Sequence, residues 1–197
     1  MMLRNIVFDF GGVILDWNPR YFYDEYFGDR QKSEWFLTHI CPYEWNVEMD
    51  GGKPIAQGIR ERVALFPEWE KEIRLYFADW SRMVPSEIPG MNALVRDLKA
   101  RGYHTYGLTN WSAETFNSIR HLFPTLALME GIVVSGEEKL LKPDPRIFHL
   151  LETRYGLDFS ESLFIDDNPD NVRGSEAAGL PAVRFESADQ IRALLLG

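Results

Sequence analysis

Four short segments of the chain carry groups that, brought together, could bind and transfer a phosphoryl group. They combine carboxylates, a hydroxyl, an amide, an ammonium and glycine N–H groups: Asp9-Phe10-Gly11-Gly12, Thr109-Asn110, Lys142 and Asp166-Asp167. Carboxylates placed close together repel one another unless a cation lies among them. Oxygen ligands suit Mg²⁺, whose coordination is completed by water and substrate phosphate. These residue types therefore predict a Mg²⁺-dependent site for phosphoryl transfer.

Within this prediction Asp9 is the nucleophile, because a carboxylate paired with a metal ion can form an aspartyl-phosphate intermediate. Lys142 neutralises Asp9 and the transferring group, so it acts through charge and position. The predicted catalytic pair is therefore Asp9 and Lys142. The donors expected on the phosphate oxygens are backbone N–H groups and short polar side chains: Gly11, Gly12, Thr109 and Asn110.

Each segment also has a purely structural explanation. An Asp before two glycines favours a turn, and an acid pair can interact with the dipole at a helix N-terminus. Thr109 and Asn110 could cap a turn between a strand and a helix, and Lys142 could be solvated. Four chemically compatible groups at strand ends are harder to explain in this way, so the functional interpretation is preferred.

Predicted strands and helices alternate around the four segments. One apolar run ends at Asp9, and further strands are predicted at 103–110, 131–136, 162–167 and 181–185. Helical spacing predicts helices at 91–101, 145–155, 169–178 and 188–196. The predicted N-caps are Ser112, Asp144 and Asn168. Alternation implies parallel βαβ units, so the polar groups at the strand ends converge on one edge of the sheet.

Residues 17–88 differ in character from the rest of the chain. Strand-like runs are absent there, and aromatic residues recur at spacings of three and four, as in Trp69-Ile73-Phe77-Trp80. Breaks at glycine and proline predict four or five short helices. An aromatic cluster can stack on sugars, but filling a small core is its commoner use. A compact helical insertion is therefore predicted.

The composition excludes several classes of protein. The 197 residues have a formal net charge of -9, whereas nucleic-acid binders usually show a basic patch, so nucleic acid is not an expected partner. A single cysteine, Cys41, permits no intrachain disulfide and fits a reducing compartment. The apolar run near the N-terminus is short and is broken by Asp9, which predicts neither a signal peptide nor a membrane span. We expect a soluble, cytoplasmic protein with no membrane partner, whose oligomeric state the sequence does not predict.

In this order, the four segments resemble the signature motifs of the haloacid dehalogenase superfamily. The matching stretches are Asp9-Phe10-Gly11-Gly12-Val13, Leu108-Thr109-Asn110, Lys142-Pro143-Asp144 and Phe164-Ile165-Asp166-Asp167-Asn168. The resemblance covers the whole chain. It implies a doubly wound, Rossmann-like α/β core of residues 1–15 and 89–197 and an inserted helical cap of residues 16–88. It also implies a Mg²⁺-dependent phosphatase that acts on a small phosphorylated metabolite.

The resemblance further implies how the metal is bound. Mg²⁺ would be held by the Asp9 carboxylate, the backbone carbonyl of Gly11 and Asp167, with Asp166 supporting it through water. Asn171 stands where many family members carry another acid, which weakens that part of the metal shell.

Gly11 departs from the pattern of most phosphatases in the family, which carry a second Asp there as the general acid for the leaving group. Loss of a positioned acid typically costs about 10²–10⁴ in rate. The leaving group could therefore be one that departs easily, such as the sugar of an aldose 1-phosphate. Some members with a similar first motif resemble sugar-phosphate phosphatases. Alternatively another acid could substitute, and Asp16 is the nearest candidate.

A third possibility is that the substrate is not a phosphate ester. Halide departs without a proton, and the 2-haloacid dehalogenases of the superfamily also lack the second Asp. The pair Asp166-Asp167 favours a phosphatase, because such a cluster near Asp9 would be costly without a cation. A regulatory module that binds a phosphorylated ligand without turnover also stays open.

The cap is expected to set specificity, because it excludes water and contacts the leaving group. The candidate residues come from the segment just after the first motif and from a predicted loop at 43–52: Asp16, Trp17, Asn18, Trp45, Glu48 and Asp50.

Overall fold

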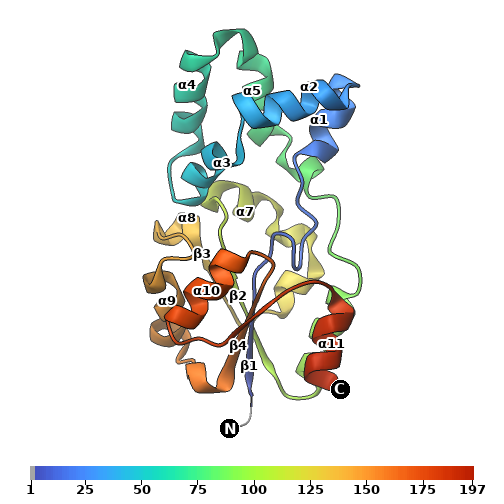
Figure 1. Ribbon diagram of the computed structural model, residues 1–197, viewed down its shortest axis with the longest axis vertical. Helices are drawn as coiled ribbons and strands as arrows, with labels where there is room; N and C mark the ends of the chain where they lie inside the picture. Colours follow the sequence, from blue (N-terminus) through green and yellow to red (C-terminus); the bar gives the residue numbers. More distant parts are fainter. Residues whose placement is uncertain (1–2) are drawn as a thin grey trace.

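A five-stranded parallel sheet forms the centre of the lower half of the molecule (Figure 1). The computed structural model describes residues 3–197. The strands are β1 (Asn5–Phe8), β2 (His104–Thr109), β3 (Gly131–Val134), β4 (Ser162–Asp166) and β5 (Ala182–Arg184). They lie in the order β3-β2-β1-β4-β5, and all neighbouring pairs are parallel. The predicted α/β class with a doubly wound parallel sheet is confirmed.

Helices cover both faces of this sheet. On one face pack α6 (Met91–Ala100), α7 (Ala113–Ile119) and α11 (Ala188–Leu196), and on the other α9 (Pro145–Tyr155) and α10 (Pro169–Ala177). The middle strand β1 serves both faces, because its side chains alternate in direction. Ile6 and Phe8 join the apolar core of the first face, and Val7 joins that of the second.

The register of the central strands brings two of the predicted segments together. Phe8 of β1 pairs with Gly107 of β2 and with Ile165 of β4. The next residue, Asp9, donates its backbone N–H to the Ile165 carbonyl at 2.9 Å. The residue after Ile165 is Asp166, so the acids that end β1 and β4 are neighbours across the sheet.

Most of the predicted N-caps agree with the structure, and these helix starts position the other segments. The side chain of Asp144 accepts a hydrogen bond from the N–H of Arg146, and Asn168 accepts one from Asp170, so both predicted N-caps are confirmed. Ser112 precedes α7 as predicted, but its side chain makes no capping hydrogen bond. The strand predicted at 131–136 ends at Val134, and a short helix, α8 (Ser135–Glu138), follows it.

Residues 16–88, which we call the cap, contain helices and no paired strand within the described chain. Its α-helices are α1 (Arg20–Phe27), α2 (Arg30–Trp35), α3 (Tyr43–Asp50), α4 (Ile55–Leu65) and α5 (Glu70–Ala78), with a π-helical turn at Phe36–Ile40. They lie above the sheet, beyond the carboxyl ends of its strands, and α3 is the helix nearest to the core (Figure 1). Six of the fifteen cap aromatics are buried, and six more pack partly buried against the same apolar core. The buried ones are Phe22, Tyr23, Phe36, Trp45, Tyr76 and Trp80.

The prediction of a loop at 43–52 is wrong over most of its length. The structure has helix α3 from Tyr43 to Asp50, which begins after Pro42 and ends at Gly51. Its buried side chains come from two faces, so the apolar periodicity that marks an amphipathic helix is weak.

The chain enters and leaves the cap through two adjacent segments. The N–H of Asp16 donates to the Ser86 carbonyl at 3.0 Å, and that of Ile88 donates to the Ile14 carbonyl at 2.8 Å. This pairing is compatible with the predicted boundaries at 15/16 and 88/89, which stay a prediction. Among residues 3–197, no helix combines the length and apolarity that crossing a membrane requires.

Gly107 allows the turn after β1 to pack against β2, and this contact is testable. A Cβ at Gly107 would overlap the ring of Phe10, which is fully buried and stacks on Phe116. We expect Gly107→Ala to lower the free energy of unfolding by about 1–3 kcal/mol through overpacking, measured by urea denaturation.

Gly58→Ala is the matched control. Its Cβ would also meet a side chain closely, but that side chain is the flexible end of Met49, and Gly58 lies inside α4. Alanine stabilises a helix interior by about 1 kcal/mol relative to glycine, and this gain offsets the cost of moving Met49. We therefore expect little net change in the free energy of unfolding. Equal losses in the two variants would contradict the role given to the Phe10 ring.

Candidate active site

A single buried ammonium joins the ends of two strands. Lys142 Nζ lies 2.9 Å from Asp9 Oδ1 and donates to Asp166 Oδ2 at 2.7 Å and to the Leu108 carbonyl at 3.0 Å. The side chain of Lys142 is fully buried, and that of Asp9 is nearly so. The predicted catalytic residues Asp9 and Lys142 are therefore brought into direct contact.

The same burial shifts the protonation of both groups. Burial raises the pKa of Asp9 to about 7, because loss of water disfavours the charged carboxylate; Lys142 opposes this shift, and Asp166 and Asp167 add to it. Burial alone would lower the pKa of Lys142, but the negative charges of Asp166 and Asp9 outweigh it and raise that pKa. Burial disfavours the charge of Asp9 or of Lys142 alone, and contact between the two charged groups stabilises both.

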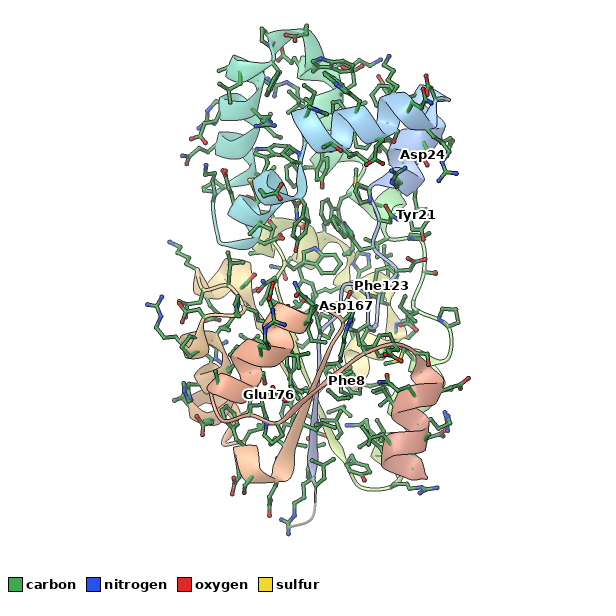
Figure 2. All side chains as sticks on the ribbon, viewed as in Figure 1. Phe8, Tyr21, Asp24, Phe123, Asp167 and Glu176 are labelled. Carbon is green, nitrogen blue, oxygen red and sulfur yellow. The ribbon has the colours of Figure 1, made fainter. Side chains whose placement is uncertain are left out.

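The two acids after β4 have different surroundings. Both Asp166 oxygens are engaged: Oδ1 accepts the Asn168 N–H at 2.8 Å, Oδ2 accepts from Lys142, and the Asn171 amide donates to both. Asp167 is exposed and lies at the edge of the core that faces the cap (Figure 2). It lines a cavity there. Asp167 is therefore the acid of this pair with free oxygen atoms, and Asp166 orients Lys142.

These acids could hold a divalent cation. Asp9, Asp166 and Asp167 each offer a carboxylate oxygen, and the three oxygens lie within 4.8 Å of one another. Gly12 has a φ of 79°, and a Cβ there would lie 2.6 Å from Asp167 Oδ2, so the backbone leaves room for this carboxylate only because residue 12 is glycine. Oxygen-only donors at this spacing fit Mg²⁺.

The predicted phosphate donors divide into two groups. Thr109 is buried, and its Oγ1 has no hydrogen-bond partner among residues 3–197, as expected of a group that awaits a ligand. The side chain of Asn110 is already engaged, since its amide donates to the Lys142 carbonyl at 3.0 Å and its Oδ1 accepts the Lys142 N–H at 2.8 Å. Asn110 therefore holds the backbone of Lys142, and the second N–H of its amide is left to donate to a phosphate oxygen. The Gly12 N–H, also predicted as a phosphate donor, already donates to the Leu15 carbonyl at 2.9 Å, so it is not free for phosphate.

A cavity of about 500 Å³ lies between the core edge and the cap. Its core wall includes the predicted residues Asp9, Gly11, Gly12, Asn110, Lys142 and Asp167. Its cap wall includes Trp17, Tyr43, Asn46, Val47, Asp50 and Trp80. A ligand in this cavity would contact both halves of the molecule.

Four cap residues predicted to contact substrate lie elsewhere, and these expectations are corrected. Both oxygens of Asp16 accept from the Tyr21 hydroxyl at 2.9 Å, and Asn18 Oδ1 accepts the Arg20 N–H. Trp45 is buried inside the cap, where its indole N–H donates to the Gly58 carbonyl. Glu48 is exposed and pairs with Lys53. None of the four lines the cavity, whereas Trp17 and Asp50 do.

Three cavity residues that the sequence analysis missed, Tyr43, Asn46 and Val47, share one face of α3 with the predicted residue Asp50. Tyr43, Asn46, Val47 and Asp50 all line the cavity, and their spacing of three and four places them on one side of a helix. Trp45 lies on another side of α3 and packs on Tyr76 and Phe77. Spacing of three and four shows which residues share a side of a helix, but it has no such meaning in a loop, which the sequence analysis expected here.

Removal of the shared ammonium tests the electrostatics of the site. We expect Lys142→Met to lower the free energy of unfolding by about 3–5 kcal/mol near pH 8, because it leaves buried carboxylates without their partner. Burial raises the pKa of Asp9 to about 7. Lys142 opposes this rise, so in the variant the pKa of Asp9 lies higher still. The deficit should therefore shrink as the pH falls toward 7, because Asp9 of the variant gains a proton and no longer needs the cation.

The measurement is chemical denaturation in EDTA at several pH values. Lys99→Met is the matched control, because Lys99 pairs with Glu130 on the surface, and such pairs contribute less than about 1 kcal/mol. A deficit of similar size in the two variants, or one that does not vary with pH, would contradict this account.

Comparison with known proteins places this geometry in a family. A family model for haloacid dehalogenase-like hydrolases matches residues 3–179. Among curated proteins, a sesquiterpene phosphatase from Aspergillus oryzae is 27% identical over 178 residues, which make up 88% of this chain and 85% of that protein.

Solved structures show the same fold at low sequence identity. A HAD family enzyme from Bacteroides thetaiotaomicron, crystallised with magnesium and inorganic phosphate, gives a TM-score of 0.71 at 21% identity, over 94% of this chain and 95% of its own. The L-2-haloacid dehalogenase from Xanthobacter autotrophicus gives a TM-score of 0.67 at 14% identity, over 100% of this chain and 84% of its own. The fold is thus found both in an enzyme that binds magnesium and phosphate and in a haloacid dehalogenase.

Proposed function

This chain belongs to the haloacid dehalogenase-like hydrolases, and on that premise we propose that it is a Mg²⁺-dependent phosphatase of small phosphomonoesters. The observation that carries the proposal is the cluster of Asp9, Asp166 and Asp167 around one buried lysine. Three carboxylates at this spacing favour a divalent cation, and a cation beside Asp9 suits an anionic substrate.

Mg²⁺ would be held by Asp9, Asp167 and the backbone carbonyl of Gly11, with Asp166 supporting it through water. When bound, it supplies positive charge for the phosphate oxygens and for the acids around it. The free oxygens of Asp167, the space left by Gly12 and the unpartnered oxygen of Thr109 support this assignment.

The reaction that this site supports is attack by Asp9 on phosphorus. One Asp9 oxygen bonds to the phosphoryl group as the bond to the leaving oxygen breaks, which gives an aspartyl-phosphate. Water then hydrolyses this intermediate and regenerates Asp9. Lys142 orients Asp9 and balances the charge of the transferring group, and Asn110 keeps Lys142 in place through two hydrogen bonds to its backbone.

The acid cluster favours a phosphatase over a 2-haloacid dehalogenase. Attack on a haloacid carbon needs no divalent cation. Without a cation the repulsion among Asp9, Asp166 and Asp167 would destabilise the folded protein and contribute nothing to the reaction. The likeness to a solved dehalogenase concerns the fold, so it does not weigh against this choice.

The cap wall supports a small sugar phosphate as the substrate class. Trp17 and Trp80 line the cavity, and their indole N–H groups have no hydrogen-bond partner within residues 3–197. Aromatic side chains with unpartnered donors suit a leaving group that carries hydroxyls. A panel that includes aldose 1-phosphates and 6-phosphates is therefore the appropriate screen.

The central test is release of inorganic phosphate from this panel. We expect turnover in Mg²⁺ and none above background in EDTA, and Asp9→Asn should abolish turnover because the amide cannot attack phosphorus. Asp97→Asn is the control, since Asp97 pairs with Arg192 on the surface away from the cavity.

Two outcomes would overturn the proposal. Halide release from a 2-haloacid in EDTA would assign the dehalogenase reaction instead. Tight phosphate binding by the wild-type protein with no turnover of any ester would indicate a binding module.

Metal binding can be tested without activity. Mg²⁺ at about 100 times its Kd should raise the Tm of the wild-type protein by about 5–10 °C, because it binds the folded state alone. Asp167→Asn should remove most of this shift, since Asp167 has the free oxygens of the cluster. Asp170→Asn should keep it, because Asp170 lines the cavity but lies outside the acid cluster. A Tm that does not respond to Mg²⁺ would remove the metal from the proposed mechanism.

A further inference from the structure

The proposed reaction needs a proton for its leaving group, and the first motif offers none. Residue 11 is glycine, and a Cβ there would meet only the Trp111 ring, at 3.9 Å. Four carboxyl groups line the cavity: Asp9, Asp50, Asp167 and Asp170. Asp9 and Asp167 belong to the acid cluster, and Asp170 is exposed and pairs with Arg173. Asp50 remains, and it comes from the cap.

We propose that the Asp50 carboxyl of the cap is the general acid that protonates the leaving-group oxygen, in place of the acid missing at residue 11. The inference rests on the proposed phosphatase function. It identifies the source of the proton, and it predicts that the enzyme accepts poor leaving groups as well as good ones.

The position of Asp50 is set from both halves of the molecule. It is the last residue of α3 and shares the cavity-facing side of this helix with Tyr43, Asn46 and Val47. Its Oδ1 accepts the Ser112 N–H at 2.8 Å, and its backbone carbonyl accepts the Ser135 hydroxyl at 2.6 Å. These bonds from the core hold the carboxyl at the junction between cap and core.

The surroundings of Asp50 favour its protonated form. It is 4% exposed, and no ion pair among residues 3–197 involves it. It ends a helix, where the backbone dipole disfavours negative charge. The ionisable groups that interact with it are Asp9 across the cavity and the phenols of Tyr43 and Tyr76, none of which is a cation.

Burial accordingly raises the pKa of Asp50 to about 8, against the hydrogen bond from Ser112, and Asp9 adds to the rise. Asn46 is the neighbour of the second carboxyl oxygen of Asp50. Its amide nitrogen lies 2.9 Å from Asp50 Oδ2, and its Oδ1 has no partner within the described chain. With this amide turned over, Asn46 Oδ1 would accept the proton of Asp50 Oδ2.

The proton balance of the cycle then closes. As the phosphorus–oxygen bond breaks, its electron pair stays on the leaving oxygen, which takes the proton of Asp50; Asp9 becomes phosphorylated and Asp50 becomes a carboxylate. Water then attacks the aspartyl-phosphate, and its proton returns to Asp50 while its hydroxide joins the phosphate. One ester and one water give one alcohol and one inorganic phosphate, with both acids restored.

Asp50 could instead act only as a structural link between cap and core, and Asp50→Asn separates the two roles. Asparagine keeps the size and an oxygen acceptor for Ser112, and its amide could donate to the orphaned oxygen of Asn46. The structural link is thus retained while the proton is lost.

The experiment compares two esters in wild type and Asp50→Asn. For an aldose 6-phosphate, whose alkoxide leaves poorly, we expect kcat to fall about 10²–10⁴-fold. For 4-nitrophenyl phosphate, whose phenolate departs without a proton, we expect little change. Ser135→Ala is the control: it removes a bond between cap and core but no acid, so any effect should be the same for both esters.

The wild-type pH profile gives a second readout that needs no variant. Activity on the 6-phosphate should fall as the pH rises through about 8, where Asp50 loses its proton. Activity on 4-nitrophenyl phosphate should lack this fall, and so should Asp50→Asn.

Three results would overturn the inference. Asp50→Asn could affect both esters equally or affect neither, or the wild-type activity on the two esters could fall in the same way as the pH rises through 8. Failure of the wild-type protein to hydrolyse any ester would refute the proposed function itself, and is a separate result.

Discussion

One buried ammonium organises the catalytic half of this molecule. Lys142 touches the acids that end β1 and β4 and a carbonyl of β2, so three strands of the sheet meet at a single positive charge. A buried charge of either sign is unfavourable alone, and the geometry is stable because the opposite charges are satisfied together. Asn110 extends this arrangement by bonding both sides of the Lys142 backbone, which makes it a positioning residue.

The acids that remain outside this pairing determine what the site can bind. Asp166 is saturated with donors, whereas Asp167 is exposed and adjacent. Asn171 stands where family members often have an acid, and its neutral amide orients Asp166 without adding negative charge. In the proposed mechanism the core wall would bind a cation and an oxyanion, while Asp9 and Asp167 are engaged there and Asp170 pairs with Arg173.

The cap wall of the cavity differs from the core wall in chemistry, since aromatic side chains and one carboxyl line it. Its helix α3 meets the core where Ser112 and Ser135 hydrogen-bond to Asp50, so a cap carboxyl is held beside the cavity. The proposed division of labour follows from this contact: the core would bind and transfer the phosphoryl group, and the cap would handle the alcohol. Binding of the leaving group and delivery of its proton would then depend on the same helix.

Patterns in the sequence predict the sheet, its parallel direction and the convergence of Asp9, Lys142 and Asp166, because strand ends, caps and glycine turns are local features with local causes. They also identify Gly11 as a departure. Three features come from the packing of the folded chain: Asn110 holds a backbone, Trp45 faces the cap interior, and Asp50 meets Ser112. The last of these contacts joins residues 62 positions apart. Which side of α3 faces the core depends on how the whole cap packs, and no local pattern in the chain contains that information.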